Sequence, residues 1–160
     1  TTQSFYIGRA SVAVPGAVAG LADLAQRHGR LPLATLLVPA IRLARRGVVM
    51  APATLRILSL LRPIFVDTSA LAALFLPGGR LPQPGDRLLF PEFAATLRRL
   101  SETGPSLFYH GDVAQAIATD QATHGGLLTA EDLASYQVRR AEPIQVDYRG
   151  YTVSLPSLPS

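Results

Sequence analysis

Cysteine is absent from the 160 residues, which excludes a disulfide framework and any thiolate metal site and leaves the redox compartment open. Lysine is absent as well, so arginine supplies all 15 basic residues behind the net charge of +4. No apolar run approaches the roughly 18 uninterrupted residues of a membrane span, and the first residues lack the basic and apolar regions of a signal peptide. We therefore expect any targeting segment to lie outside this chain.

Charged residues are scarce at 16%, whereas hydrophobic residues make up 48% and are spread along the whole length. That balance excludes a disordered tail and allows a packed core in a chain of one-domain size. Neither an internal repeat nor a linker divides the sequence. Residues 1–160 are therefore expected to form one unit.

Apolar residues recur at helical spacing through most of the chain, and each run is bounded by proline, glycine or a capping residue. We expect helices over 14–29, 32–47, 52–61, 91–104, 112–124 and 129–135. Pro39 predicts a kink or local break in the second helix, and Pro63 predicts the end of the third. Gly16 and Gly20, four residues apart, favour close backbone packing over ligand binding. The stretch 77–84, rich in proline and glycine, predicts a surface loop.

Two of these helices carry more detailed signals. In the helix at 91–104, Ala94, Leu97 and Leu100 are spaced to face the core. At the helix over 129–135, the Thr129 hydroxyl can accept a hydrogen bond from the backbone of Asp132, whose carboxylate suits the first turn.

The hydrophobic period changes to two near the end of the chain. Apolar residues alternate with polar ones over 144–148 and again over 151–155, across an Arg149-Gly150 turn. An isolated two-stranded hairpin is marginal in water, so we expect this one to continue a larger sheet. The sequence thus predicts a mostly α chain, helical over 14–135, with a short antiparallel β hairpin within 136–155.

The arginines give an isoelectric point near 10.1, which invites a nucleic-acid hypothesis. However, the pairs Arg45-Arg46, Arg98-Arg99 and Arg139-Arg140 are scattered, and no aromatic residues are interleaved with them for base stacking. We expect the first two pairs in the last turns of helices, where cations offset the helix dipole. A non-catalytic, arginine-rich helical binding module remains an alternative, and it predicts salt-sensitive binding to nucleic acid or anionic surfaces.

Metal and cofactor signatures are weak. His28, His110 and His124 each precede a glycine, two of them where helices are expected to end, and none has a second ligand at metal-binding spacing. The adjacent acids Glu131 and Asp132 are typical of helix initiation, because neighbours on a helix point apart. No phosphate-binding glycine loop occurs. The sequence therefore predicts neither a metal site nor a cofactor.

Nucleophile signatures are equally weak, since neither a G-x-S-x-G nor an S-x-x-K motif is present. Thr1 is the one tempting candidate, because the α-amine of a processed N-terminal threonine can activate its own hydroxyl. A chain can begin at any residue, however, so we assign Thr1 no catalytic role.

Six segments have a characteristic composition and order. They are V-P-G-A-V-A-G-L (14–21), P-A-I-R-L-A-R-R-G (39–47), F-A-A-T-L-R-R-L (93–100), F-Y-H-G-D-V-A (108–114), G-G-L-L-T-A-E-D-L-A-S-Y (125–136) and Y-R-G-Y (148–151). Together they cover roughly residues 11 to 155 and resemble an interior part of the large subunit of the γ-glutamyltransferase family, also called γ-glutamyltranspeptidase or glutathione hydrolase.

This resemblance implies a partial domain of a four-layer αββα N-terminal-nucleophile hydrolase, whose central sheet the strands of 136–155 join. It implies a precursor that cleaves itself into two subunits, without any cofactor. The new N-terminal threonine of the small subunit then attacks a γ-glutamyl amide, usually glutathione, and water, an amino acid or a peptide takes up the acyl group. Family resemblance also suggests a periplasmic or secreted bacterial protein.

The resemblance assigns no catalytic residue to this chain. The family's nucleophile follows Y-R-G-Y at a distance that makes Ser160 too early. Thr1 and Thr2 precede large-subunit sequence, so their likeness to the start of the small subunit is accidental. Arg9 does not match the family's carboxylate-binding arginine motif, and the substrate-binding residues stay unknown. A cephalosporin-acylase-like amidohydrolase of the same superfamily is an open alternative, because these segments are shared scaffold.

Overall fold

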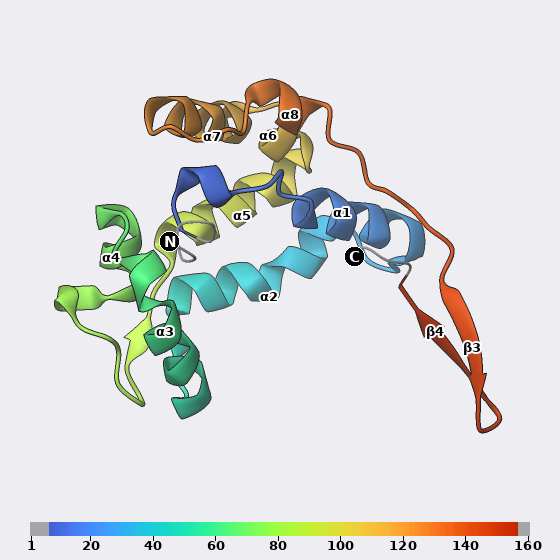
Figure 1. The fold of residues 1–160 in the computed structure, drawn as a ribbon, viewed down its shortest axis with the longest axis horizontal. Helices are drawn as coiled ribbons and strands as arrows, with labels where there is room; N and C mark the ends of the chain where they lie inside the picture. Colours follow the sequence, from blue (N-terminus) through green and yellow to red (C-terminus); the bar gives the residue numbers. More distant parts are fainter. Residues whose placement is uncertain (1–6, 157–160) are drawn as a thin grey trace.

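The computed structural model describes residues 7–156. Figure 1 shows a helical body in which two long helices, α2 and α5, lie side by side, and a β hairpin that projects from the body at one end. In chain order the elements are η2 Arg9–Ser11, α1 Ala17–His28, α2 Leu33–Arg46, β1 Val48–Val49, α3 Pro52–Phe65, α4 Ser69–Phe75, η3 Pro77–Gly79, β2 Arg87–Leu88, α5 Pro91–Thr103, α6 Ser106–Tyr109, α7 Asp112–Thr123, α8 Ala130–Ala134, β3 Ile144–Tyr148 and β4 Tyr151–Leu155.

The helix boundaries set by proline, glycine and capping residues are largely confirmed. Helix α5 begins at Pro91 and ends before Gly104, and its Ala94, Leu97 and Leu100 are all buried, as expected. Helix α8 begins with a capping box, in which the Thr129 side chain accepts from the Asp132 backbone and the Asp132 carboxylate accepts from the Thr129 backbone.

The two internal prolines interrupt neither helix. Helix α2 continues through Pro39 without a break. Helix α3 runs on to Phe65, so the prediction that Pro63 ends it was wrong. Phe65 is buried and its ring stacks on that of Phe75 with centroids 4.3 Å apart. A proline this close to the helix end removes one backbone hydrogen bond, and we infer that burial of Phe65 outweighs that loss.

Several short elements were not expected from the sequence. Helix α4 is capped by Thr68, whose hydroxyl accepts from the backbone of Leu71. Strands β1 and β2 pair antiparallel over only two residues each, Val48 with Leu88 and Val49 with Arg87. Helix α6 forms one further turn between α5 and α7. These elements lie among the long helices and connect them.

The hairpin of β3 and β4 has the predicted strands and turn. Its register pairs Ile144 with Leu155 and Tyr148 with Tyr151, around a turn in which Arg149 has a φ of 50°. All ten strand residues are exposed. The hairpin therefore presents both of its faces to solvent in this chain.

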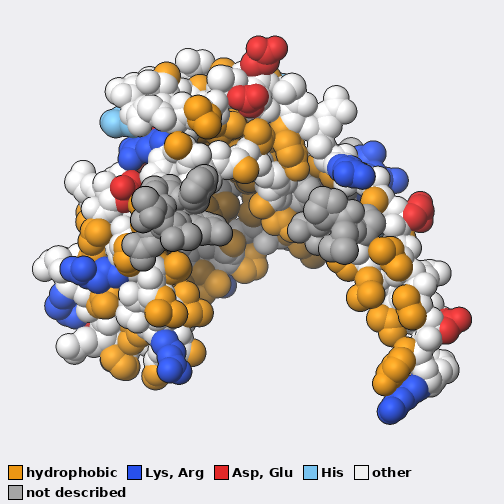
Figure 2. Space-filling model, viewed as in Figure 1, with side chains coloured by type: hydrophobic (Ala, Val, Ile, Leu, Met, Phe, Trp, Pro, Cys, Tyr) orange, Lys and Arg blue, Asp and Glu red, His pale blue; other side chains and the backbone are white. Residues whose placement is uncertain are grey.

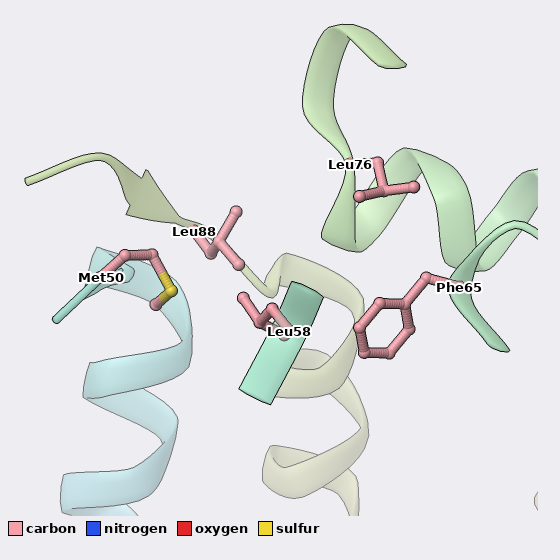
Figure 3. Close-up of a cluster of buried hydrophobic side chains, with 5 residues drawn as sticks. All are labelled: Met50, Leu58, Phe65, Leu76 and Leu88. Atoms are coloured by element: carbon pink, nitrogen blue, oxygen red, sulfur yellow. The ribbon is translucent and has the colours of Figure 1, made fainter. Parts of the chain in front are cut away.

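Three hydrophobic clusters form the core among residues 7–156. Figure 3 shows the first, where Leu58 and Phe65 of α3 and Leu88 of β2 point toward one another and toward Met50 and Leu76, which lie just outside neighbouring elements. The second joins α1, α2, α5, α6 and α7 around three buried leucines, Leu97, Leu100 and Leu107. The third contains Ala114, Leu128 and Leu133, and the Leu133 side chain is fully buried. This core positions the segments that carry the family-like motifs.

Candidate functional site

The segment that contains Val14, Pro15 and Gly16 is held by a tyrosine from a distant helix. The Tyr109 hydroxyl donates to the Pro15 carbonyl at 2.7 Å and accepts from the Ala19 backbone at 3.0 Å. Helix α1 has Gly16 at its N-cap, with no side chain there to satisfy the free N–H groups of the first turn. Tyr109 therefore caps α1 from outside the helix.

A second tyrosine completes this arrangement. The Tyr136 ring stacks on the Tyr109 ring, with centroids 5.5 Å apart and an interplanar angle of 11°. It also lies against Gly16, where an added Cβ would come within 2.9 Å of the Tyr136 Cζ atom. Close packing was expected at Gly16 and is confirmed there. Gly20 has open space around it, so that expectation was wrong for Gly20. We call Pro15, Gly16, Tyr109 and Tyr136 the tyrosine cluster.

Burial raises the pKa of Tyr109 above its ordinary value, while the hydrogen bond from Ala19 acts in the opposite direction. The phenol therefore stays protonated at neutral pH and keeps donating to the Pro15 carbonyl. The tyrosine cluster joins three of the six motif segments, those at 14–21, 108–114 and 125–136. Its chemistry is that of a structural anchor, since Tyr109 uses its hydroxyl on the backbone.

A charged cluster surrounds Arg9, which precedes the V-P-G segment by five residues. Arg9 donates twice to Asp120, each bond 3.0 Å long, and its third nitrogen is 3.9 Å from Asp67. The His124 Nδ1 atom is 3.1 Å from the same Asp120 carboxylate. The hydrogen bonds from Arg9 lower the pKa of Asp120 despite an opposing desolvation effect. Because both carboxylates lie against the Arg9 guanidinium, Arg9 links the N-terminal segment to helix α7.

The other singled-out residues lie at helix ends or on the surface. His28 ends α1, His110 follows α6 and His124 follows α7. Glu131 and Asp132 lie in the first turn of α8, as expected for helix initiation. Within residues 7–156, no three histidine or acidic side chains come close enough together to hold a metal ion. Thr1, Thr2 and Ser160 lie outside the described residues.

The arginine pairs behave differently from one another. Arg45 and Arg46 occupy the last turn of α2, as expected. Arg98 and Arg99 do not occupy the last turn of α5, so that prediction was wrong. Arg99 instead reaches across to Asp112 in the first turn of α7, with an Nη2–Oδ2 distance of 2.6 Å. The hydrogen bond from Arg99 lowers the pKa of Asp112.

Large apolar side chains remain on the surface of the body and along the hairpin, as Figure 2 shows. Among them are Leu21 and Leu60, which are 63% and 74% exposed, and Tyr151 of the hairpin at 75%. Large exposed apolar patches are typical of surfaces that bind other proteins, membranes or ligands. No helix among the described residues is long and apolar enough to cross a membrane.

Three comparisons with known proteins bear on these features. The family model described as gamma-glutamyltranspeptidase matches residues 1–160. The chain is 40% identical over 154 residues to the acylase ACY 1 proenzyme of Pseudomonas sp. (strain SE83), covering 96% of this chain and 28% of that protein. It is 37% identical over 147 residues to glutathione hydrolase 3 of Arabidopsis thaliana, covering 92% of this chain and 23% of that protein.

Among solved structures, the chain resembles the Helicobacter pylori gamma-glutamyltranspeptidase with a TM-score of 0.93 and 34% identity. That similarity covers 100% of this chain and 46% of the solved chain. The chain thus spans less than a third of the length of the two curated relatives named above.

Proposed function

The chain belongs to the γ-glutamyltranspeptidase family, and we propose that it is a scaffold segment of the large subunit of an enzyme that transfers or hydrolyses γ-glutamyl groups. The observation that carries this proposal is the match of the family over all 160 residues. The tyrosine cluster supports it, because three family-like segments meet there through specific contacts.

In this proposal the intact protein is made as a precursor that cleaves itself into two subunits. The N-terminal threonine of the small subunit, outside this chain, attacks the γ-glutamyl amide, and its own α-amine acts as the general base. Hydrogen-bond donors stabilise the tetrahedral oxyanion. No residue of this chain is proposed to take part in bond making or breaking.

The chain's proposed role is to support the central sheet. Residues 14–135 form the helical region, and the β3–β4 hairpin within 136–155 joins the sheet of the intact fold. Both faces of the hairpin are exposed here, which suits a strand pair that is completed by neighbouring strands. Arg140, just before β3, donates to Asp23 of α1 with an Nε–Oδ2 distance of 3.2 Å. We propose that this ion pair orients the hairpin against the helical region.

The proposed partners follow from the same reaction. They are the small subunit, a γ-glutamyl donor such as glutathione, and water, an amino acid or a peptide as acceptor. Two observations support the two-subunit arrangement. Relatives of this chain are named proenzymes, and this chain has large apolar side chains on its surface that a second subunit would bury. Bacterial relatives favour a periplasmic or secreted location.

An acylase is the second candidate function, because the ACY 1 proenzyme is 40% identical to this chain against 37% for the glutathione hydrolase. An arginine-rich binding module has weaker support. Arg9, Arg80, Arg99 and Arg140 are all paired with aspartates, so their charge is partly neutralised within the chain.

Two anilides separate the enzymatic candidates. We expect the intact protein to release p-nitroaniline from γ-glutamyl-p-nitroanilide and to discriminate strongly against glutaryl-p-nitroanilide. The glutaryl compound keeps the terminal carboxylate but lacks the α-amino group, so a site built for an α-amino acid would leave the groups that bind the ammonium unpaired. A preference for the glutaryl compound would establish the acylase, and absence of turnover with both would refute the proposed function. Replacing the small-subunit threonine with alanine provides the inactive control.

A further inference from the structure

Helices α2 and α5 pack along each other and leave a groove between them. A hollow of about 350 Å³ is lined by Ile41 and Arg45 from α2 and by residues of α5 that include Ala94 and Arg98. A second hollow of about 520 Å³ extends along α2 and shares Ile41 and Arg45 with the first (its other lining residues are Val38, Arg42 and Arg46). We call Arg42, Arg45, Arg46 and Arg98 the groove arginines.

The groove arginines are all exposed, and within residues 7–156 none of them forms an ion pair. The helix dipole explains part of this charge, because Arg45 and Arg46 lie in the last turn of α2. It does not explain Arg98, which lies in α5 without a helix end nearby, or Arg42, one turn earlier in α2. The groove therefore gathers four arginines that form no ion pair within residues 7–156.

The lining indicates which kind of molecule fits. Its remaining members are aliphatic or proline, so no aromatic ring lies there for a nucleic-acid base to stack on. Arginine combined with aliphatic surface is typical of protein interfaces, where the planar guanidinium binds carboxylates in a bidentate way. The chemistry favours a peptide segment that carries aspartate or glutamate.

The geometry points to the groove as the docking site for an acidic segment of the small subunit, with carboxylates that pair with Arg45 and Arg98. This inference rests on the proposed function, which supplies that subunit. Charge complementarity brings the segment to the groove, and the apolar floor at Ile41 and Ala94 packs against its side chains. The contact then contributes to the association of the two subunits.

Arginine modification in the intact, unmutated protein tests whether the groove is covered. Phenylglyoxal reacts with exposed guanidinium groups, and mass spectrometry reports the rate at each site. We expect Arg45 and Arg98 to react at least fivefold more slowly in the assembled protein than after the subunits are separated. Equal rates in both states would overturn the inference. Protection that appears only after oligothymidylate is added would identify a nucleic-acid occupant and would overturn it too.

A charge-matched pair of double variants tests the energetic role. We expect Arg45→Gln with Arg98→Gln to raise the dissociation constant of the two subunits at least tenfold and to weaken its dependence on salt. Arg27→Gln with Arg30→Gln removes the same charge from exposed sites near the end of α1, and we expect a change of no more than about twofold. Equal effects of the two double variants would overturn the inference.

Activity toward γ-glutamyl-p-nitroanilide, measured on the same unmutated sample, separates this inference from the proposed function. An active protein whose groove arginines react freely would keep the function and overturn the docking site. An inactive protein with protected groove arginines and salt-sensitive subunit association would keep the docking site and overturn the function.

Discussion

Replacing Gly16 and Gly20 with alanine should change the stability of helix α1 in opposite directions. Gly16 has φ −96° and ψ −15°, a conformation that alanine adopts readily, so the backbone does not oppose the change. The added Cβ would instead meet the Tyr136 hydroxyl and come within 2.9 Å of its Cζ. The Tyr136 ring has little freedom to retreat, because it stacks on Tyr109.

The magnitudes follow from these contacts. Overpacking at the added Cβ destabilises the folded state by about 1–3 kcal/mol. Replacing glycine also restricts the unfolded chain, which stabilises the folded state by about 0.4–1 kcal/mol. We therefore expect Gly16→Ala to destabilise α1 by about 1–2 kcal/mol. Gly20 lies inside α1 with open space around its Cα, so Gly20→Ala should stabilise the helix by about 0.5–1 kcal/mol.

Native-state hydrogen exchange of the α1 amides measures these changes locally. Gly16→Ala should speed exchange about five- to thirtyfold, and Gly20→Ala should slow it about two- to fivefold, since about 1.4 kcal/mol corresponds to a factor of ten. Adding Tyr136→Leu to Gly16→Ala should restore part of the protection. Exchange that slows in both single variants would refute the close packing inferred at Gly16.

Three further predictions concern the free energy of unfolding measured with urea. Tyr109→Phe should lower it by about 1–3 kcal/mol, because the change removes two hydrogen bonds worth about 0.5–1.5 kcal/mol each. Tyr136→Phe should lower it much less, and equal effects of the two variants would contradict the capping role of Tyr109. Leu133→Ala should cost about 2–5 kcal/mol by the same assay, and a cost under about 1 kcal/mol would show that the Leu133 site is not tightly packed. The Asp120 pKa is lowered in the folded state, so the stability from its pairing with Arg9 is present above pH 3.8 and is lost as the pH falls through the lower folded value. Asp120→Asn should reduce that acid sensitivity in pH-dependent unfolding, and an unchanged pH profile would contradict the pairing.

Local signals predicted much of the fold. Pro91 and Gly104 set the limits of α5, and the capping residue Thr129 set the start of α8. The period-two pattern gave both strands of the hairpin. These predictions succeeded because each depends on residues that are close in sequence, where backbone chemistry alone decides the outcome.

Contacts between distant residues were beyond such signals. The sequence predicts a helix end at Pro63, and nothing nearby in sequence reveals that Phe65 stacks on Phe75. Strands β1 and β2 have two residues each, too few for a detectable period.

The contacts of the candidate site could not be predicted from the sequence for the same reason. Tyr109 is 94 residues from Pro15, and Arg9 is 111 residues from Asp120, so only tertiary packing brings these pairs together. One local clue was available at the tyrosine cluster: the segments that resemble the family contain both the small Gly16 and the two tyrosines. Their spacing predicts close backbone packing at both Gly16 and Gly20, and only the position of Tyr136 distinguishes the two glycines.

The N-terminal sequence of each chain in the purified intact protein tests the family-based mechanism most directly. We expect two chains, with a small subunit that begins at a threonine outside residues 1–160 and that fails to form when this threonine is replaced with alanine. An active protein that remains a single uncleaved chain, or whose activity depends on the α-amine of Thr1, would contradict the proposed scaffold role of this chain.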